Sequence, residues 1–209
     1  MTLPLGSAAL ASNVIPVCVV RNDGPEALLP TAVLDVSEVD LASGTETPLI
    51  EGAPVALGAG PGAVRYFALP ALRNASAVLR AVVSNRGGAV LYDNVLYLAA
   101  PAAWATALSA VSVTAAVADA SNADGSVNVT VAAAGGGGPA LFVTLTTLSE
   151  GRFSDNALPL LAVGAPRLLS FSCFDAAAEC SRELLRDSLR VEHLALYWGA
   201  SPLADMDAP

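Results

Sequence analysis

The sequence of 209 residues has no lysine, a single histidine, three cysteines and only 5% aromatic residues. Ten arginines stand against 19 acidic residues, so the net charge at pH 7 is −9. Neutralising a phosphate backbone requires a cationic surface, and an anionic membrane surface repels an acidic chain. The composition therefore excludes nucleic acid and membrane surfaces as expected partners.

Long uninterrupted hydrophobic runs are also missing, although 54% of the residues are apolar and the mean hydropathy is +0.58. The uncharged segment 95–118 is interrupted by Pro101 and diluted by hydroxyl side chains, so we predict no transmembrane span. The first residues contain neither a positive segment nor a continuous apolar one, which predicts no secretory signal in this chain. A chain with this apolar fraction is expected to fold rather than to be disordered.

Metal and catalytic motifs are equally scarce. The only histidine, His193, excludes zinc sites that need two imidazoles, and we expect no metal and no cofactor. No nucleophile motif accompanies His193, so a structural role is favoured over a general base. The glycine run 135–138 lacks the Gly-Lys-Ser/Thr of a phosphate-binding loop, which favours a hairpin loop. Asp35, Glu38 and Asp40 lie on one predicted strand, where solvated acids are more typical than a carboxylate pair or calcium ligands.

Two further features depend on the compartment. Cys18 lies in an apolar run and is predicted to be a buried free thiol, whereas Cys173 and Cys180 are close enough in sequence for a local disulfide under oxidising conditions. Asn74 and Asn128 begin Asn-x-Ser/Thr triplets and are candidate N-glycosylation sites if the protein is secreted.

The patterns that are present are those of β-strands. Apolar residues alternate with polar ones along much of the chain, as in antiparallel sheets with one solvated face. The predicted strands are 14–21, 31–41, 62–69, 77–84, 89–98, 111–117, 126–131, 141–146, 167–171 and 189–198. A phase slip near Glu38 predicts a β-bulge, and 85–88 predicts a hairpin turn. Only 175–185 has helical spacing.

Two successive sets of strands predict two tandem antiparallel β-sandwich domains in an all-β chain. We place the first domain at residues 1–102 and the second at 103–200. The last residues, 201–209, are small, acidic and proline-containing, and are expected to form a disordered tail.

One local string is more distinctive than the rest. It consists of Gly151, Arg152, Phe153, Ser154, Asp155 and Asn156. Gly and Asn permit unusual backbone dihedral angles, Ser and Asp can close turns, and the phenyl ring can anchor the loop in the core. The string therefore predicts a corner between two strands, with the arginine available to pair with a carboxylate of another domain.

In its context, this string resembles the C-terminal immunoglobulin-like domain of β-mannosidases of glycoside hydrolase family 2. The segment 181–198 is similar to the last part of that domain, and 17–23 to the opening strand of the sandwich that precedes it. Asn94–Leu98 with Pro101 resembles the junction between the two. The resemblance spans nearly the whole chain and implies that both sandwiches are immunoglobulin-like. One departure is Ala157–Pro159, which replaces the Gly and aromatic residue usual after the corner.

The resemblance also implies what the chain lacks. In that family a retaining mechanism uses two glutamates on a (β/α)₈ barrel of roughly 250 residues, which this chain has no room for. We therefore expect a non-catalytic accessory region that packs on such a barrel, supplied in cis or missing, and whose parent would hydrolyse terminal β-D-mannosides. Whether the chain itself is an enzyme stays open, and no catalytic residue is assigned.

The alternative is a free-standing immunoglobulin-like module that binds carbohydrate, such as mannose-containing glycans, or protein. Relatives in the family are commonly lysosomal or secreted, which would permit both the disulfide and the glycans.

Overall fold

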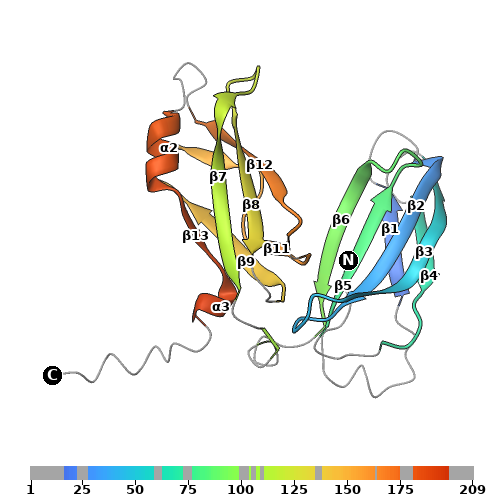
Figure 1. Ribbon diagram of the computed structural model, residues 1–209. Helices are drawn as coiled ribbons and strands as arrows, with labels where there is room; N and C mark the ends of the chain where they lie inside the picture. The colour runs from blue at the N-terminus through green and yellow to red at the C-terminus, as the bar shows by residue number, and fades with distance from the viewer. Residues whose placement is uncertain are drawn as a thin grey trace. The chain divides into compact units, whose positions relative to one another are not determined.

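The computed structural model describes residues 17–22, 28–58, 63–72, 77–98, 104, 107–108, 111–134, 138–162, 164–174 and 181–197. The chain divides into two compact units, one comprising residues up to Asp40 and Thr45–Trp104, the other Leu41–Gly44 and residues from Ala105 onward. Each unit consists mainly of antiparallel strands, which confirms the all-β prediction (Figure 1).

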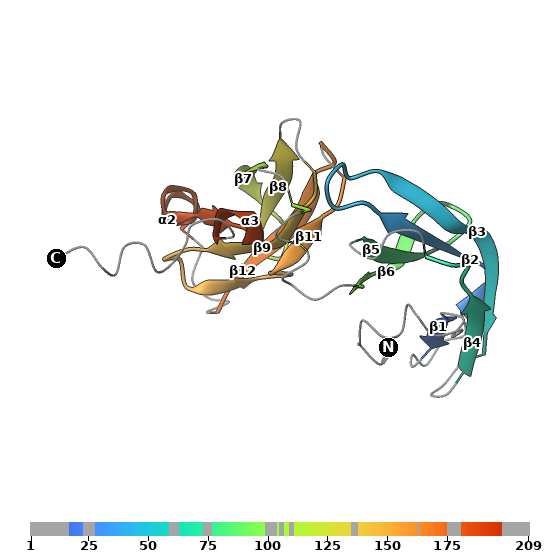
Figure 2. The same ribbon diagram turned by 90° about the horizontal axis from the view of Figure 1, so that it is seen from below.

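The first unit is built from two antiparallel sheets. Its described strands are β1 (Val17–Asn22), β2 (Leu28–Val39), β3 (Glu46–Leu57), β4 (Ala63–Ala68), β5 (Val78–Ser84) and β6 (Val90–Tyr97). One sheet has the order β3-β2-β5-β6 and the other pairs β1 with β4 (Figure 2). Cys18 and Val20 of β1 join Leu34 and Val36 of β2 in one buried cluster, so the core lies between the sheets.

Strand β3 was missed by the sequence analysis because its prolines and Gly52 argue against a strand. It lies at the edge of its sheet, where a proline need not remove a ladder hydrogen bond. Pro48 is paired with Ser37 and Pro54 with Val33 across the β2–β3 ladder. Gly52 has φ of +57°, and its N–H donates to the Asp35 carboxylate at 2.7 Å.

The bulge predicted near Glu38 is wrong for β2, because the extra residues of the β2–β3 ladder lie in β3. From Leu34 to Val36, β2 advances by two residues while β3 advances by three, from Ala53 to Ile50. The β2–β3 register shifts between Leu34 and Val36 and again between Val36 and Ser37. On the other side of β2, pairing with β5 runs without a shift from Val33 to Val39. The hairpin predicted at 85–88 is confirmed, because the Gly88 N–H donates to the Asn85 carbonyl at 2.9 Å.

The opposite edge of the same sheet is formed by β6. Val90, Leu91 and Tyr92 at its start are all exposed, with exposed fractions of 58%, 43% and 55%. Further along, the Asn94 side-chain oxygen accepts the N–H of Val95 at 2.9 Å. One backbone donor of this edge is therefore occupied by a side chain of its own strand.

The second unit contains two more sheets and two short helices. Its elements are β7 (Ser112–Ser121), β8 (Val127–Ala134), β9 (Ala140–Thr146), β10 (Gly151–Phe153), β11 (Leu158–Leu160), β12 (Arg167–Cys173), α2 (Arg182–Ser188), β13 (Arg190–Glu192) and α3 (Leu194–Tyr197). The sheets have the orders β10-β12-β8-β7 and β11-β9-β13.

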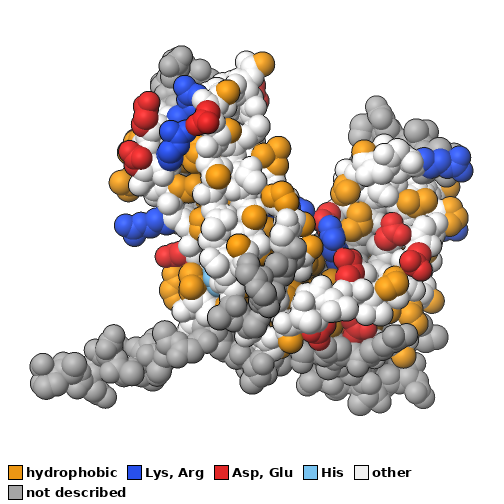
Figure 3. Space-filling model, in the orientation of Figure 1, with side chains coloured by type: hydrophobic (Ala, Val, Ile, Leu, Met, Phe, Trp, Pro, Cys, Tyr) orange, Lys and Arg blue, Asp and Glu red, His pale blue; other side chains and the backbone are white. Residues whose placement is uncertain are grey.

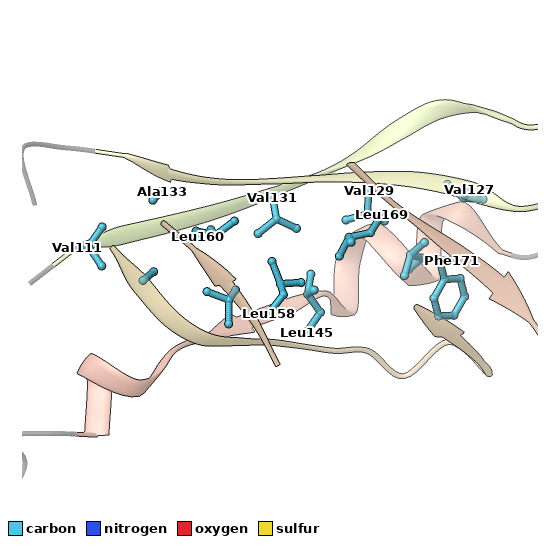
Figure 4. Close-up of a cluster of buried hydrophobic side chains, with 13 residues drawn as sticks. Val111, Val127, Val129, Val131, Ala133, Leu145, Leu158, Leu160, Leu169 and Phe171 are labelled. Carbon is cyan, nitrogen blue, oxygen red and sulfur yellow. The ribbon is translucent and has the colours of Figure 1, made fainter. Parts of the chain in front are cut away.

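Alternation along the strands explains the core of this unit. Val127, Val129 and Val131 of β8 are fully buried, whereas the residues between them are only partly buried. Figure 4 shows these valines facing Leu158 and the ring of Phe171 from other strands. The core is thus filled by small branched side chains and very few aromatic ones, as the composition implies.

Two predictions at the C-terminal end were only partly right. The helix expected at 175–185 is observed at Arg182–Ser188, with Ser181 as its N-cap, and 175–180 lie outside the described residues. The strand expected at 189–198 ends at Glu192 and is followed by α3. There the Leu196 N–H donates to the His193 carbonyl at 3.1 Å, so a helical turn replaces the ladder.

Gly151 begins β10 because no side chain fits at its position. A Cβ there would lie 2.4 Å from the Cζ of Phe171 and 2.5 Å from the Ser172 carbonyl oxygen. Phe171 is fully buried and its ring lies 5.0 Å from that of Phe153, so it has no free space to move into.

We therefore expect Gly151→Ala to lower the free energy of unfolding by about 3 kcal/mol, as overpacking of a core does. Chemical denaturation followed by circular dichroism measures the change. Gly58→Ala is the matched control, since a Cβ at Gly58 meets nothing within 4 Å. Equal effects of the two substitutions would contradict this explanation.

Ala157 follows the corner with φ of +55°, a left-handed conformation that costs an alanine roughly 1 to 2 kcal/mol.

Ala157→Gly should therefore raise the free energy of unfolding by up to about 1 kcal/mol, because relief of strain exceeds the added chain entropy of glycine. The same exchange in the regular strand β8, Ala132→Gly, should lower it by roughly 0.5 to 1 kcal/mol. Thermal and chemical unfolding of both variants would reveal the opposite signs, and a loss of stability in both would show that Ala157 is not strained.

Candidate functional site

The corner at Gly151–Asn156 carries the chain from one sheet of the second unit to the other. β10 pairs with β12, whereas β11, directly after the corner, pairs with β9. Ser154 still belongs to the first sheet, since its N–H donates to the Ser170 carbonyl at 2.7 Å and its hydroxyl accepts the Ser170 N–H at 3.0 Å.

Asn156 makes the corresponding connection to the second sheet. Its side-chain oxygen accepts the N–H of Leu145 at 2.8 Å, and its side-chain nitrogen donates to the Leu145 carbonyl at 3.0 Å. The amide therefore replaces a backbone partner of β9 at the point where the chain changes sheets. An aspartate has no donor for the carbonyl, which explains the residue type.

The other corner residues have structural or solvent contacts. Phe153 packs on Phe171, and Asp155 accepts the Asn156 N–H at 2.8 Å. Arg167 lies 3.9 Å from the Asp155 carboxylate, but both side chains are about half exposed, so this pair contributes little stability. Arg152 is exposed, and its expected pairing with another domain stays a prediction.

The acidic residues of β2 do not form a carboxylate pair. Asp35 and Glu38 are three positions apart on a strand whose pairing with β5 is regular, so their side chains leave opposite faces and their Cα atoms are roughly 10 Å apart. Asp35 accepts the Gly52 N–H. Glu38 is only 4% exposed, so the expectation of a solvated acid is wrong at this position. The geometry supports structural roles for both.

A polar cluster that the sequence did not reveal lies on the sheet of the first unit. The guanidinium of Arg80 donates to both carboxylate oxygens of Asp93, at 3.1 and 2.9 Å, and lies 3.9 Å from Glu46. Glu46 also accepts the hydroxyl of Ser37. The bond to Asp93 is the main cause that raises the pKa of Arg80. These residues come from four strands, so only the strand register could have brought them together.

A second network closes the hairpin between β7 and β8. The amides of Asn122 and Asn128 exchange hydrogen bonds at 2.9 and 3.2 Å, and Asn122 also donates to Ser126 at 2.8 Å. The hydroxyl and N–H of Ser126 donate to Asp124, which lowers the pKa of that carboxyl. Asn128, a candidate glycosylation site, is thus engaged within the hairpin, while Asn74 lies outside the described residues.

The cysteines differ in state. Cys18 is a free thiol that is 4% exposed, and burial raises its pKa. Cys173 is disulfide-bonded, and Cys180, its predicted partner, lies outside the described residues. The helix that follows this connection is held by Leu185 in the core. Arg186 lies 2.9 Å from the Asp119 carboxylate, but both side chains are largely exposed, so this pair contributes little stability. Figure 3 shows arginine and acidic side chains gathered over α2 and the adjoining end of β7.

One small cavity lies in the described part of the first unit. It is lined by Cys18, Val36, Asn94 and other mostly apolar residues and has a volume of about 20 Å³, far less than a monosaccharide occupies. Within the described ranges, no three His, Cys, Asp or Glu side chains gather where they could hold a metal ion. Nor does any described helix have the length and apolarity to cross a membrane.

Comparison with known proteins supports the immunoglobulin-like fold. Residues 108–196 match the family model of the mannosidase immunoglobulin-fold domain. The exo-chitosanase CsxA of Amycolatopsis orientalis has a similar fold, with a TM-score of 0.59 and 18% identity over 84% of this chain and 24% of the enzyme. A variant of that enzyme in complex with PNP-beta-D-glucosamine gives a TM-score of 0.60 and 19% identity, with the same coverage.

The chain thus spans about a quarter of the length of these neighbours, which are family 2 glycoside hydrolases. No curated protein matches the sequence. The fold and the family model agree with the resemblance inferred from the sequence. Residues 108–196 of the second unit thus form an immunoglobulin-fold domain that matches the mannosidase family model.

Proposed function

We propose that the chain is a non-catalytic accessory region of a β-mannosidase-like glycoside hydrolase, which packs on and supports a (β/α)₈ barrel. The match of residues 108–196 to the mannosidase immunoglobulin-fold domain is the observation that carries this proposal. The barrel of the parent would supply the two carboxylates, about 5 to 5.5 Å apart, that hydrolysis with retention requires.

The described side chains favour a supporting role over a catalytic one. Asp93 and Glu46 are engaged by one guanidinium, Asp35 by a backbone N–H, and Asp124 by Ser126. Carboxylates held in this way stabilise turns and sheets. The corner residues similarly use their polar atoms on the backbone of their own unit.

The sugar preference of the parent enzyme is a second part of the proposal. The family model names mannosidases, whereas the similar solved structures are of an exo-chitosanase that was crystallised with a glucosamine derivative. Because the family model names mannosidases, we propose terminal β-D-mannosides as the substrate of the parent.

We expect the purified 209-residue chain to hydrolyse neither an aryl β-D-mannoside nor an aryl β-D-glucosaminide, because under this proposal the two catalytic carboxylates belong to the barrel of the parent enzyme. Release of the chromogenic phenol is the measurement, and a mock purification from the same host controls for carried-over enzymes. Hydrolysis above that control would overturn the non-catalytic assignment.

The accessory role has a separate test in the coding DNA. An upstream open reading frame for a barrel with two glutamates at the ends of its strands is expected, and its absence would contradict the proposal. If a barrel is present, the full-length enzyme should prefer the mannoside over the glucosaminide, and the reverse preference would correct the substrate.

A glycan array with the isolated chain tests the binding-module alternative, for which mannan binding is the expected signal.

A further inference from the structure

His193 lies in the second unit between β13 and α3, where it has almost no contact with solvent. Its exposed fraction is 4%, and almost no histidine surface is visible on the face shown in Figure 3. The ring forms a hydrogen bond with the backbone of Val111, just before β7. Its Nδ1 is buried and has no hydrogen-bond partner among the described residues.

A buried Nδ1 without a partner tolerates only the neutral ring. A proton on this atom would place a positive charge in the protein interior with no acceptor for the new N–H, and an uncompensated buried charge is strongly unfavourable. In the unfolded or detached segment the same proton is solvated by water. The geometry therefore couples protonation of His193 to release of the segment that carries it.

The charged groups around the ring offer no compensation. Among the elements packed near it, β9 contains no charged residue, and β7 contains only Asp119, which pairs with Arg186. The carboxylate of Glu192 on β13 forms a hydrogen bond with Tyr197 of α3, and this bond raises the pKa of that tyrosine. Arg190, the remaining charged residue of β13, is itself a cation.

The segment that carries His193 is weakly attached compared with the rest of the unit. β13 is an edge strand with three residue pairs to β9, and α3 has four residues, none of them buried. The sheet of β7, β8 and β12, by contrast, contains longer ladders and the fully buried valines. A local penalty at His193 should thus release β13 and α3 before it unfolds the sandwich.

We propose that His193 is an acid-sensitive latch, whose protonation detaches β13 and α3 from β9 and exposes that edge of the sheet. This conformational device is independent of the proposed glycosidase role. Its pH range follows from the ring itself. Burial lowers the pKa of His193 below its ordinary value of 6.5, an effect that the bond to Val111 partly opposes.

Because the pKa of His193 is lowered in the attached form, acid favours the detached form. Above pH 6.5 both the attached and detached segments are neutral, and the latch is fully closed. Below pH 6.5 the detached segment binds the proton first, so the equilibrium constant for opening increases as the pH falls, by at most tenfold per pH unit. The increase ends once the pH passes the lowered pKa of the attached form.

Hydrogen exchange measured by mass spectrometry on the 209-residue chain tests the latch. After correction for intrinsic rates, peptides covering 190–197 should lose protection by severalfold between pH 7.5 and 5.5, while peptides of β8 keep theirs. The sequence has one histidine, so no other imidazole titrates in this range. Unchanged protection of 190–197, or an equal loss in β8, would overturn the proposal.

Two variants separate protonation from packing. His193→Gln keeps an N–H for the Val111 backbone but cannot be protonated, so the difference between pH 7.5 and 5.5 should disappear. Tyr197→Phe is the matched control, because it loosens the same segment by removing the bond to Glu192 and leaves His193 in place. It should lower protection at both pH values and retain the acid-induced loss. A pH difference that persists in His193→Gln would contradict the assignment to His193, whatever the wild-type profile.

Discussion

The close approach of Gly151 to the ring of Phe171 is the contact on which the second unit depends. A backbone without a side chain lies against a fully buried ring, and this lets β10 pair with β12 over the core. Three residues later the chain leaves that sheet, and Asn156 connects it to β9. One steric constraint thus determines where the corner forms, and the amide determines where it ends.

The strands with clean alternation could be predicted from the sequence, and the exceptions have physical causes. Val127, Val129 and Val131 identify the inner face of β8 without further information, because each second residue must avoid water. β3 escapes detection because Pro48 and Pro54 are acceptable only at an edge, and edge position is a property of the whole sheet. The helix α3 is a single turn, which begins at the hydrogen bond between the His193 carbonyl and the Leu196 N–H. Apart from its leucines, no residue pattern in the sequence predicts this turn.

In the candidate site, too, some features could be predicted from the sequence and others could not. The string Gly151–Asn156 could be recognised because its residues act over short distances. Ser154 and Asn156 bind the backbone of neighbouring strands, and Phe153 packs on Phe171. Arg80, Asp93, Glu46 and Ser37 are far apart in the sequence and meet only through the register of four strands. The unpartnered nitrogen of His193 is likewise invisible in the sequence, since burial and hydrogen bonding are set by tertiary packing.

A supporting domain and a catalytic one use carboxylates in different ways. A catalytic acid must keep or receive a proton in a pocket that holds a sugar, whereas Asp35, Asp93 and Asp124 accept bonds that complete turns and ladders. Some of the acidic side chains that give the chain its net negative charge make such contacts, and others are exposed to solvent. The function we propose requires only that these sandwiches be rigid.

The side-chain amide of Asn94 has a consequence for how the molecule behaves at high concentration. An exposed edge strand with Val90, Leu91 and Tyr92 at its start could accept a strand from another molecule and begin ordered aggregation. Because Asn94 already occupies the N–H of Val95, an incoming strand meets one missing rung midway along β6. The resistance of this edge to pairing with another molecule therefore depends on the hydrogen bond between Asn94 and Val95. The sequence has no lysine that could protect the edge instead.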